Sequence, residues 1–410
     1  METPATIGLA NQILFSFGIV LATGILSGFI AQKIKVPDVV VFLLAGILLG
    51  PEVLGLLRIG ADSPLNQVIL IFGSCYIIFD GGASLRFKIL KEVCITIFAL
   101  STAGVLIMTF ITGLAAYYIL GLPFIVALLL GAATASTDPA TLVPILRKLD
   151  IRERVAQTVI SESAFNDVVS AIVTFGILSV AMGKGEFALV TSLISLVKQS
   201  MIGILAGAAL GYLSALLIAH EKYAFLAEYA PVITLMAVIG AYLGSENMHA
   251  SGFMAVFVFG LVVGNKESFG FHMTLAEQKT LQEYIFTTAF IMRMFIFILL
   301  GSQVDFGVVS NFLGGGVAVV TILMLVSRPL TVFLCTLPDW RAKWKVNEII
   351  FMCWTRETGV IPAAIAGLLM AIKAPGSHVI ASVIFIAVLM TIIIQATTTR
   401  WLARKLGLLS

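Results

Sequence analysis

Thirteen apolar stretches follow one another along this chain, and most are long enough to cross a lipid bilayer. Among its 410 residues, we expect the spans to be 7–32, 39–57, 66–84, 93–120, 123–146, 154–182, 195–219, 224–244, 248–265, 281–301, 311–335, 347–371 and 378–402. A spanning helix needs about 20 predominantly apolar residues and satisfies its own backbone hydrogen bonds. The pattern predicts an all-α polytopic membrane protein with 13 transmembrane helices in one membrane domain, residues 1–410.

The composition disfavours a soluble function. Hydrophobic residues make up 60% of the chain and charged residues 11%, whereas soluble domains carry about 25% charged residues. No nucleophile–base pair and no nucleotide-binding loop is evident, so we expect neither an enzyme nor a nucleic-acid partner. The four cysteines are scattered through apolar segments and predict no disulfide framework, metal site or cofactor. The first stretch has no basic run before it, which favours a retained span in the cell membrane over a cleaved signal peptide.

The basic residues predict the orientation of the spans. If the C-terminus lies in the cytoplasm, an odd number of spans places the N-terminus outside. Most of the 25 Lys and Arg residues then fall in cytoplasmic segments, while the outer loops hold Arg58, Lys184 and Lys373. Because this bias follows the positive-inside rule, we expect an N-out, C-in topology.

Two spans carry charge and proline in mid-stretch. The fifth has Asp138 directly before Pro139, and the twelfth has Arg356, Glu357 and Pro362. Proline inside a helix removes a backbone hydrogen bond and clashes with the preceding turn. Each helix is therefore expected to be broken there, or, in the alternative interpretation, only kinked.

The two interrupted spans are seven apart in order, so they cross the membrane in opposite directions. Broken helices at matching places of two inverted halves indicate a midplane binding site in secondary transporters. We interpret residues of about 7–182 and about 224–402 as inverted six-helix repeats with crossed broken helices, and about 195–219 as the linking span.

The sixth span carries the densest polar cluster, within residues 161–169. Residues three or four apart share a helix face, so Ser163 aligns with Asp167, and Glu162 with Asn166 on the adjacent stripe. A charge at the centre of a membrane helix costs about 2.5–3.5 kcal/mol, so these acids require a partner or a cation.

Asp167 and Ser163 offer hard oxygen atoms to a small cation. Asp138 and Thr137, with backbone carbonyls freed by the break, can complete such a site. The alternative is that Asp167 forms a structural salt bridge.

Buried arginines need partners as well. Arg293 and Arg328 both fall within spans, and neither can stay unpaired in hydrocarbon. We predict that Arg328 pairs with Glu162 and holds two helices together. Asn166, whose carboxamide both donates and accepts, can cap the open helix ends beside it.

Other acids have less certain roles. Asp80, near the inner end of the third span, is either an accessory ligand or gate, or an interfacial acid that answers Arg86 or Lys88. Glu228 and Glu357 are expected to be buried, and their roles stay open.

Several short motifs occur in order between about residue 10 and residue 400. They are Phe79-Asp80-Gly81-Gly82, Thr137-Asp138-Pro139-Ala140-Thr141-Leu142, Glu162-Ser163-Ala164-Phe165-Asn166-Asp167, Glu228-Tyr229-Ala230-Pro231, Arg293-Met294-Phe295-Ile296-Phe297 with Gly301, Ser327-Arg328-Pro329-Leu330 and Gly359-Val360-Ile361-Pro362-Ala363-Ala364. In these motifs the chain resembles the monovalent cation/proton antiporter family, and specifically its NhaP-type branch.

The resemblance implies an inverted-repeat bundle in which a six-helix core domain moves against a dimerisation domain. It implies a sodium ion at Asp167, with ligands from Ser163, Thr137 and Asp138 and with Asp80 nearby. It also implies a structural polar core, whose members are Asn166, Glu162, Arg328, Arg293 and Arg356. In that core Glu162 and Arg328 would be the structural pair, and Asn166 would hold the crossing of the broken spans.

The family resemblance further implies a homodimer, embedded in membrane lipid, that exchanges Na⁺ (or Li⁺) for H⁺. The pair Asn166-Asp167, rather than two adjacent aspartates, resembles the electroneutral branch and implies one-for-one exchange. A K⁺/H⁺ antiporter of the same fold is the main alternative. A Na⁺-coupled solute symporter and a channel are less favoured, because no second polar cluster is evident and a carboxylate shared by proton and cation favours alternating access.

Overall fold

The computed structural model describes residues 5–60, 63–149, 151–183, 189–219 and 226–409. Within these ranges the chain is helical throughout and has no strand beyond one isolated bridge between Ile151 and Leu409. Lys184, expected in an outer loop, and the expected start of the eighth span at residue 224 lie outside these ranges. The prediction of an all-α protein is confirmed.

The helices of the first half are α1 (Ala5–Ile34), α2 (Asp38–Leu49), α3 (Pro64–Ala83), α4 (Phe87–Ser101), α5 (Ala103–Leu120), α6 (Phe124–Thr134), α7 (Pro139–Lys148), α8 (Glu153–Ala181) and α9 (Leu189–Ala219). Those of the second half are η1 (Ala227–Tyr229), α10 (Ala230–Asn247), α11 (Gly252–Gly264), η2 (Lys266–Phe269), α12 (Leu275–Ser302), α13 (Phe306–Asn311), α14 (Leu313–Ile322), η3 (Leu323–Ser327), α15 (Arg328–Thr336), α16 (Val346–Trp354), α17 (Val360–Ala371), α18 (Ser377–Met390), η4 (Thr391–Ala396) and α19 (Thr397–Lys405).

Among the described residues, ten helical segments are long and apolar enough to cross a membrane. Three shorter apolar helices, Asp38–Leu49, Gly252–Gly264 and Val360–Met370, fall within the remaining expected spans. The chain is therefore a multi-pass membrane protein. The count of 13 spans and their orientation stay predictions.

Several expected boundaries were wrong. The seventh and tenth spans were expected to begin at 195 and 281, but α9 begins at Leu189 and α12 at Leu275. The second span was expected to reach residue 57, but α2 ends at Leu49, because Pro51 disfavours helix in the residue before it and cannot continue the helix. The fourth span was expected as one helix over 93–120. It begins at Phe87 instead and is interrupted at Thr102, which separates α4 from α5.

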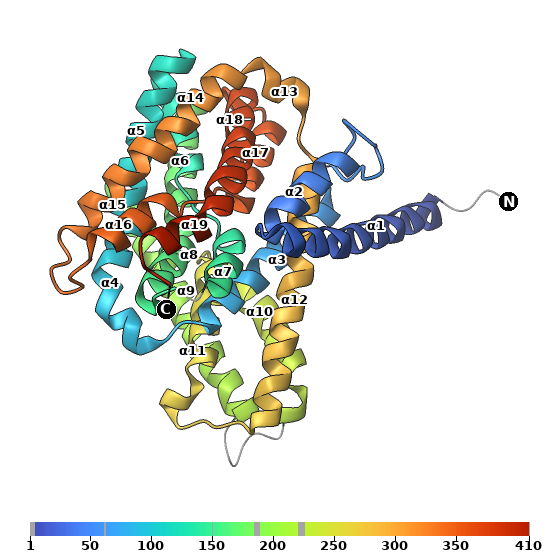
Figure 1. Ribbon diagram of the computed structural model, residues 1–410, viewed down its shortest axis with the longest axis vertical. Helices are drawn as coiled ribbons and strands as arrows, with labels where there is room; N and C mark the ends of the chain where they lie inside the picture. Colours follow the sequence, from blue (N-terminus) through green and yellow to red (C-terminus); the bar gives the residue numbers. More distant parts are fainter. Residues whose placement is uncertain (1–4, 61–62, 150, 184–188, 220–225, 410) are drawn as a thin grey trace.

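Helix contacts divide most helices into two groups, which also separate in Figure 1. The first group is α1, α2, α3, α9, α10, α11 and α12. The second group is α4, α5, α6, α8, α14, α15, α16, α17 and α18, with η4 and α19 joined to it through α18 and α16. The groups meet at α7 and α8, which contact α3, α9 and α11 as well as their own neighbours. The polar cluster of the sixth span thus lies on a helix at the boundary.

Small residues bring helices close together inside the groups. A Cβ added at Gly46 of α2 would overlap the carbonyl of Ile298 in α12, and one at Gly301 would overlap that of Leu43. Close backbone approach at glycine is the usual means of helix association in lipid, where the apolar faces gain little from burial.

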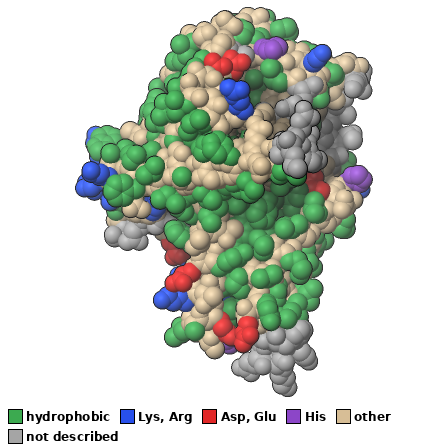
Figure 2. Space-filling view, turned by 90° about the vertical axis from the view of Figure 1, so that its right-hand side faces the viewer, with side chains coloured by type: hydrophobic (Ala, Val, Ile, Leu, Met, Phe, Trp, Pro, Cys, Tyr) green, Lys and Arg blue, Asp and Glu red, His purple; other side chains and the backbone are tan. Residues whose placement is uncertain are grey.

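The outer surface is apolar over wide areas. On the face shown in Figure 2, hydrophobic side chains dominate, and the few charged ones stand in small groups. On α1, which extends to one side of the molecule in Figure 1, Leu26 is 63% exposed and Phe29 66% exposed. Such a surface suits contact with lipid rather than water.

Candidate functional site

The two interrupted helices meet where their backbones unwind. Residues 135–138 separate α6 from α7, and residues 355–359 separate α16 from α17. The Asp138 N–H donates to the carbonyl of Glu357 at 2.8 Å. The sequence predicted both interruptions, and the structure brings them into contact.

The two prolines act differently. Pro139 is the first residue of α7, where a helix needs no N–H from it. Pro362 lies within the first turn of α17, and the break precedes it. Gly359 closes that break. A Cβ at Gly359 would overlap the Asp138 carboxylate, so only glycine permits this close approach of the two unwound segments.

Asp138 lies at the start of the two helices that leave the crossing. Its carboxylate accepts the Ala140 N–H at 3.2 Å and the Thr141 hydroxyl at 2.7 Å, both at the start of α7. It also lies directly against Gly359, the residue before the first turn of α17. A negative charge stabilises helix N-termini, whose free N–H groups form the positive end of the helix dipole. The predicted cation ligand therefore already serves as the cap of α7.

Arg356 serves the opposite helix end. Its guanidinium, which is fully buried, donates to the carbonyl of Thr134, the last residue of α6, and to that of Ser136 at 3.4 Å. It also donates to the Thr358 hydroxyl at 2.9 Å. A cation stabilises the negative C-terminal end of a helix. Asp138 and Arg356 thus compensate the helix ends that the breaks expose.

Side chains of α8 fasten the first break. The Asn166 carboxamide accepts the Thr137 N–H at 3.2 Å and donates to the Thr137 hydroxyl at 2.8 Å. The Ser163 hydroxyl donates to the Thr137 carbonyl at 3.0 Å. Asn166 thus uses both its donor and its acceptor at the open helix end, as the sequence predicted.

Asp167 lies at this junction with half of its carboxylate unused. The Ser136 hydroxyl donates to Oδ1, while Oδ2 has no hydrogen-bond partner among the described residues. The side chain is buried, with the residue 2% exposed. A buried carboxylate oxygen is rarely left unsatisfied, so Oδ2 is available to take a proton or a cation.

Glu162 is in the opposite situation. Both its oxygens accept from the Arg328 guanidinium, the second at 2.9 Å, and Arg328 Nε donates to the Met352 carbonyl at 3.1 Å. The predicted contact between Glu162 and Arg328 is present. It ties α8 to α15 and, through Met352, to α16.

Asp80 and Arg293 are both buried. No hydrogen bond among the described residues joins Asp80 to Asp167 or Asp138. Arg86, which the sequence offered as a partner of Asp80, forms an ion pair with Glu153 at 3.1 Å. Arg293 packs over the Phe290 ring, with 5.5 Å between Cζ and the ring centroid, and lines a separate cavity.

Sequence reasoning missed the role of Ser136 and misplaced Glu228. Ser136 stands in a run of hydroxyl residues, but nothing local marked it as the partner of Asp167. Glu228 was expected to be buried and is exposed, because it lies in η1, the short turn before α10. Glu357 is buried as expected, and both its carboxylate oxygens lack a hydrogen-bond partner among the described residues.

The arrangement defines a class of protein. A helical membrane bundle with two broken helices that cross beside a buried, half-satisfied carboxylate is the architecture of secondary transporters. The described residues hold no cluster of three or more His, Cys, Asp or Glu side chains suited to a resident metal ion. Hard carboxylate and hydroxyl oxygens suit a weakly held cation in transit.

The comparisons identify the family. Residues 18–405 match the family described as "Sodium/hydrogen exchanger, transmembrane", and the chain belongs to it, within the NhaP-type antiporters.

Relatives of known name are similar over nearly the whole chain. The Na⁺/H⁺ antiporter 1 of Methanocaldococcus jannaschii is 30% identical over 95% of this chain and 94% of its own. The K⁺/H⁺ antiporter NhaP of Alkalimonas amylolytica is 28% identical over 97% of this chain and 67% of its own. The solved structure of the sodium proton antiporter MjNhaP1 from M. jannaschii at pH 8 has a TM-score of 0.74 at 27% identity, and it covers 96% of this chain and 99% of its own.

Proposed function

We propose that this protein is a secondary antiporter that exchanges Na⁺ for H⁺ across the cell membrane. The observation that carries the proposal is the buried Asp167 Oδ2, which lacks a described hydrogen-bond partner at the crossing of two broken helices. The names of the M. jannaschii relatives, Na⁺/H⁺ antiporter 1 and sodium proton antiporter MjNhaP1, support sodium as the cation.

In this mechanism Asp167 binds Na⁺ and H⁺ in turn. Ser163, Thr137 and Asp138 are the other proposed ligands. Their hydroxyl and carboxylate oxygens keep lone pairs beyond the hydrogen bonds that they make. Asp80 is proposed as an accessory residue. The site cannot easily change its access from one side of the membrane to the other with neither ion bound to Asp167, because a lone buried carboxylate is costly.

Alternating access would be a movement of the second helix group against the first. A cavity of about 370 Å³ lies between them, lined by Asn66 and Gln303 from α3 and the end of α12, and by Ala363 of α17. Its polar lining is uncharged apart from Asp305. We propose that it belongs to the route between Asp167 and one side of the membrane.

The finer topology is part of the proposal. It comprises 13 spans, of which spans 1–6 and 8–13 are inverted repeats, with the N-terminus outside and the C-terminus inside. The protein is proposed to be a homodimer, as the family resemblance implies.

Exchange is proposed to be electroneutral and one-for-one. Asn166 has no titratable proton, Glu162 is held by Arg328, and Asp138 is engaged as the cap of α7. With Asp167 as the one group that changes its occupant, the moving part carries the same charge with Na⁺ or H⁺ bound.

Potassium is the alternative substrate, because relatives at similar identity are named K⁺/H⁺ antiporters. The test is reconstitution of the purified protein in vesicles with a pH-sensitive dye inside. An imposed Na⁺ gradient should move protons, and an equal K⁺ gradient should move far fewer. The reverse preference would make the protein a K⁺/H⁺ antiporter.

Asp167→Asn is the matching control. The amide cannot exchange a proton for a cation, so the variant should fold and show no exchange. Na⁺-driven proton movement in a folded Asp167→Asn protein would contradict the proposed site.

A further inference from the structure

A second cavity lies between the two helix groups, away from Asp167. Its volume is about 440 Å³. The end of α1 and start of α2 and the middle of α12 line it on the side of the first group, and α7, η4 and α19 line it on the other. None of the ligands proposed for the exchange site lines this cavity.

The charged side chains of the cavity are mostly basic. Four basic residues line it, Lys35, Lys148, Arg293 and Arg400, and Asp38 is the single acid among the lining residues. Asp38 is 4% exposed and accepts from Lys148 Nζ at 3.1 Å. This pair neutralises Lys148, while Lys35 and Arg400 remain as positive charges that Asp38 does not neutralise.

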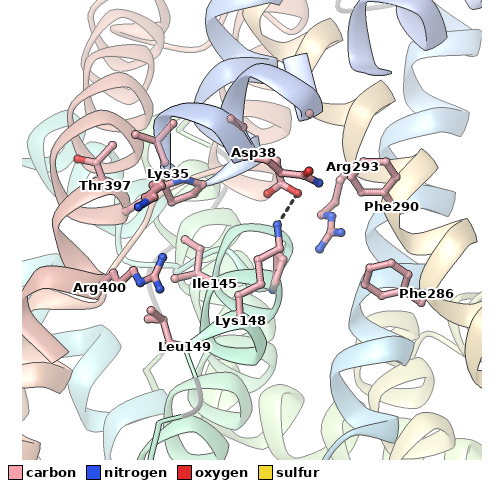
Figure 3. A pocket seen from close by; sticks show the side chains of 17 residues that line it. Lys35, Asp38, Ile145, Lys148, Leu149, Phe286, Phe290, Arg293, Thr397 and Arg400 are labelled. Carbon is pink, nitrogen blue, oxygen red and sulfur yellow. Dashed lines mark hydrogen bonds and ion pairs between the residues drawn. The ribbon is translucent and has the colours of Figure 1, made fainter. Parts of the chain in front are cut away.

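Lys35 and Arg400 face each other from opposite groups. Figure 3 shows Lys35, from the turn after α1, and Arg400, from α19, on one side of the Asp38–Lys148 pair, with Arg293, Phe286 and Phe290 on the other side. Neither Lys35 nor Arg400 forms an ion pair with a described residue.

Lys35 is held in place by the backbone. Its φ of 59° is in the left-handed region, where a lysine carries a steric cost. The adjacent Val36 N–H donates to the Ala31 carbonyl at 3.1 Å and closes the end of α1. The tight turn therefore fixes where the Lys35 side chain begins.

Such a cavity repels cations and attracts anions. Guanidinium groups match the oxygens of a phosphate with paired hydrogen bonds, and lysine adds a point charge. Basic pockets between transmembrane helices bind the phosphate-bearing headgroups of anionic lipids. Next to Lys35, the outer face of α1 exposes Phe29 (66%) and Ile30 (46%), along which acyl chains can lie.

We propose that this cavity binds a phosphate-bearing anion between Lys35 and Arg400. The group is the headgroup of an anionic phospholipid or a free phosphate. Because the cavity is lined by both helix groups, the bound anion would contact both at once.

The test measures binding, not exchange, so its failure and failure of the proposed antiport are separate results. Native mass spectrometry of the purified full-length protein would compare dioleoyl phosphatidylglycerol with the zwitterionic dioleoyl phosphatidylcholine. The test variant is Lys35→Gln with Arg400→Gln. The matched control is Lys33→Gln with Arg404→Gln, which removes the same charge from the same two regions at exposed positions that do not line the cavity.

The wild type and the control should retain phosphatidylglycerol. The affinity of the test variant for this lipid should be lower by about tenfold or more, as expected from the loss of charge-assisted hydrogen bonds. Inorganic phosphate added at constant ionic strength separates the two sources. If inorganic phosphate displaces the lipid, or if phosphate binds to the protein and the lipid does not, the site also takes the free anion. Equal anion binding by the test and control variants, or none by the wild type, overturns the proposal. Should the double variant not fold, Arg400→Gln against Arg404→Gln gives the same comparison.

Discussion

Glu162 and Asp167 stand on the same helix, both almost fully buried, yet their surroundings differ completely. Arg328 engages both oxygens of Glu162, whereas Asp167 receives one hydroxyl and keeps one oxygen without a described partner. Both side chains are carboxylates, so the residue type does not explain the difference. What separates the paired carboxylate from the one proposed to exchange its occupant is the set of donors that neighbouring helices present.

Glu162→Gln should destabilise the protein strongly. The change leaves Arg328 buried without a counter-charge, which costs about 3–5 kcal/mol. Thermal melting in detergent should show a larger fall for Glu162→Gln than for Asp167→Asn. A Glu162→Gln protein that melts like the wild type but does not transport would mean that the two acids have exchanged roles.

Glu357→Gln should behave differently from Glu162→Gln. The Glu357 side chain is fully buried, and no described residue hydrogen-bonds either carboxylate oxygen. An amide of the same shape removes a group that is costly to ionise there, so we expect a melting temperature at or above that of the wild type and retained exchange. Loss of exchange with an intact melting temperature would instead place Glu357 in the handling of ions.

Proton and sodium should compete at Asp167. At low pH protons occupy the carboxylate. The apparent affinity for Na⁺ should therefore rise as pH rises, until the site is free of protons. Measuring the Na⁺ concentration for half-maximal exchange at several pH values tests this. An apparent affinity that does not change with pH would show that the two ions use separate groups.

At the scale of elements, the two breaks work because each charge meets helix ends of the right sign. Asp138 lies at the N-termini of α7 and α17, and Arg356 receives the carbonyl end of α6. The same residues that look unfavourable in an apolar span are therefore what allows the span to be interrupted. Gly359, at the end of the second break, lets the two unwound segments approach each other closely.

Gly359→Ala should disturb this crossing. The new Cβ would overlap the Asp138 carboxylate, and overpacking of a tight interior costs about 1–3 kcal/mol. Both the melting temperature and the exchange rate should fall. Gly314→Ala, in α14 of the second helix group, is the control, since no atom lies within 4 Å of its Cβ position and it does not line the cavity of the proposed route. If both variants behave alike, the steric account of the crossing is wrong.

At the scale of the whole molecule, contacts gather the helices into two groups with the polar crossing near their boundary. Cavities between the groups are lined by residues of both. The polar residues of one are neutral apart from Asp305, and four basic residues line the other. Movement between two such bodies is the form of conformational change that this packing allows with least disruption.

Membrane voltage should leave the exchange equilibrium unchanged. Voltage acts on net transferred charge, at about 2.3 kcal/mol per charge per 100 mV, and one-for-one exchange transfers none. Reversal gradients for Na⁺/H⁺ exchange should be equal in vesicles clamped at zero and at −100 mV with K⁺ and valinomycin, provided that K⁺ is not transported. A reversal point that shifts with voltage would point to a second proton carrier, with Asp138 the first to test.

Much of the fold follows from local features of the sequence. Apolar length predicts the helical segments, and Pro139 next to Asp138 predicts an interruption, because both effects act within a few residues. The contact between Glu162 and Arg328 was also predictable, since few buried groups can answer a buried arginine.

The remaining features depend on which distant segments pack together. Four of these features join segments far apart in the chain. They are the hydrogen bond from Ser136 to Asp167, the position of Asp138 at the start of both α7 and α17, the hydrogen bonds from Arg356 to the end of α6, and the basic cavity at Lys35 and Arg400. No local period encodes these partners. Hydrophobic length determines that a segment enters the membrane, but only tertiary packing decides which polar groups meet there and which carboxylate oxygens are left without a described partner.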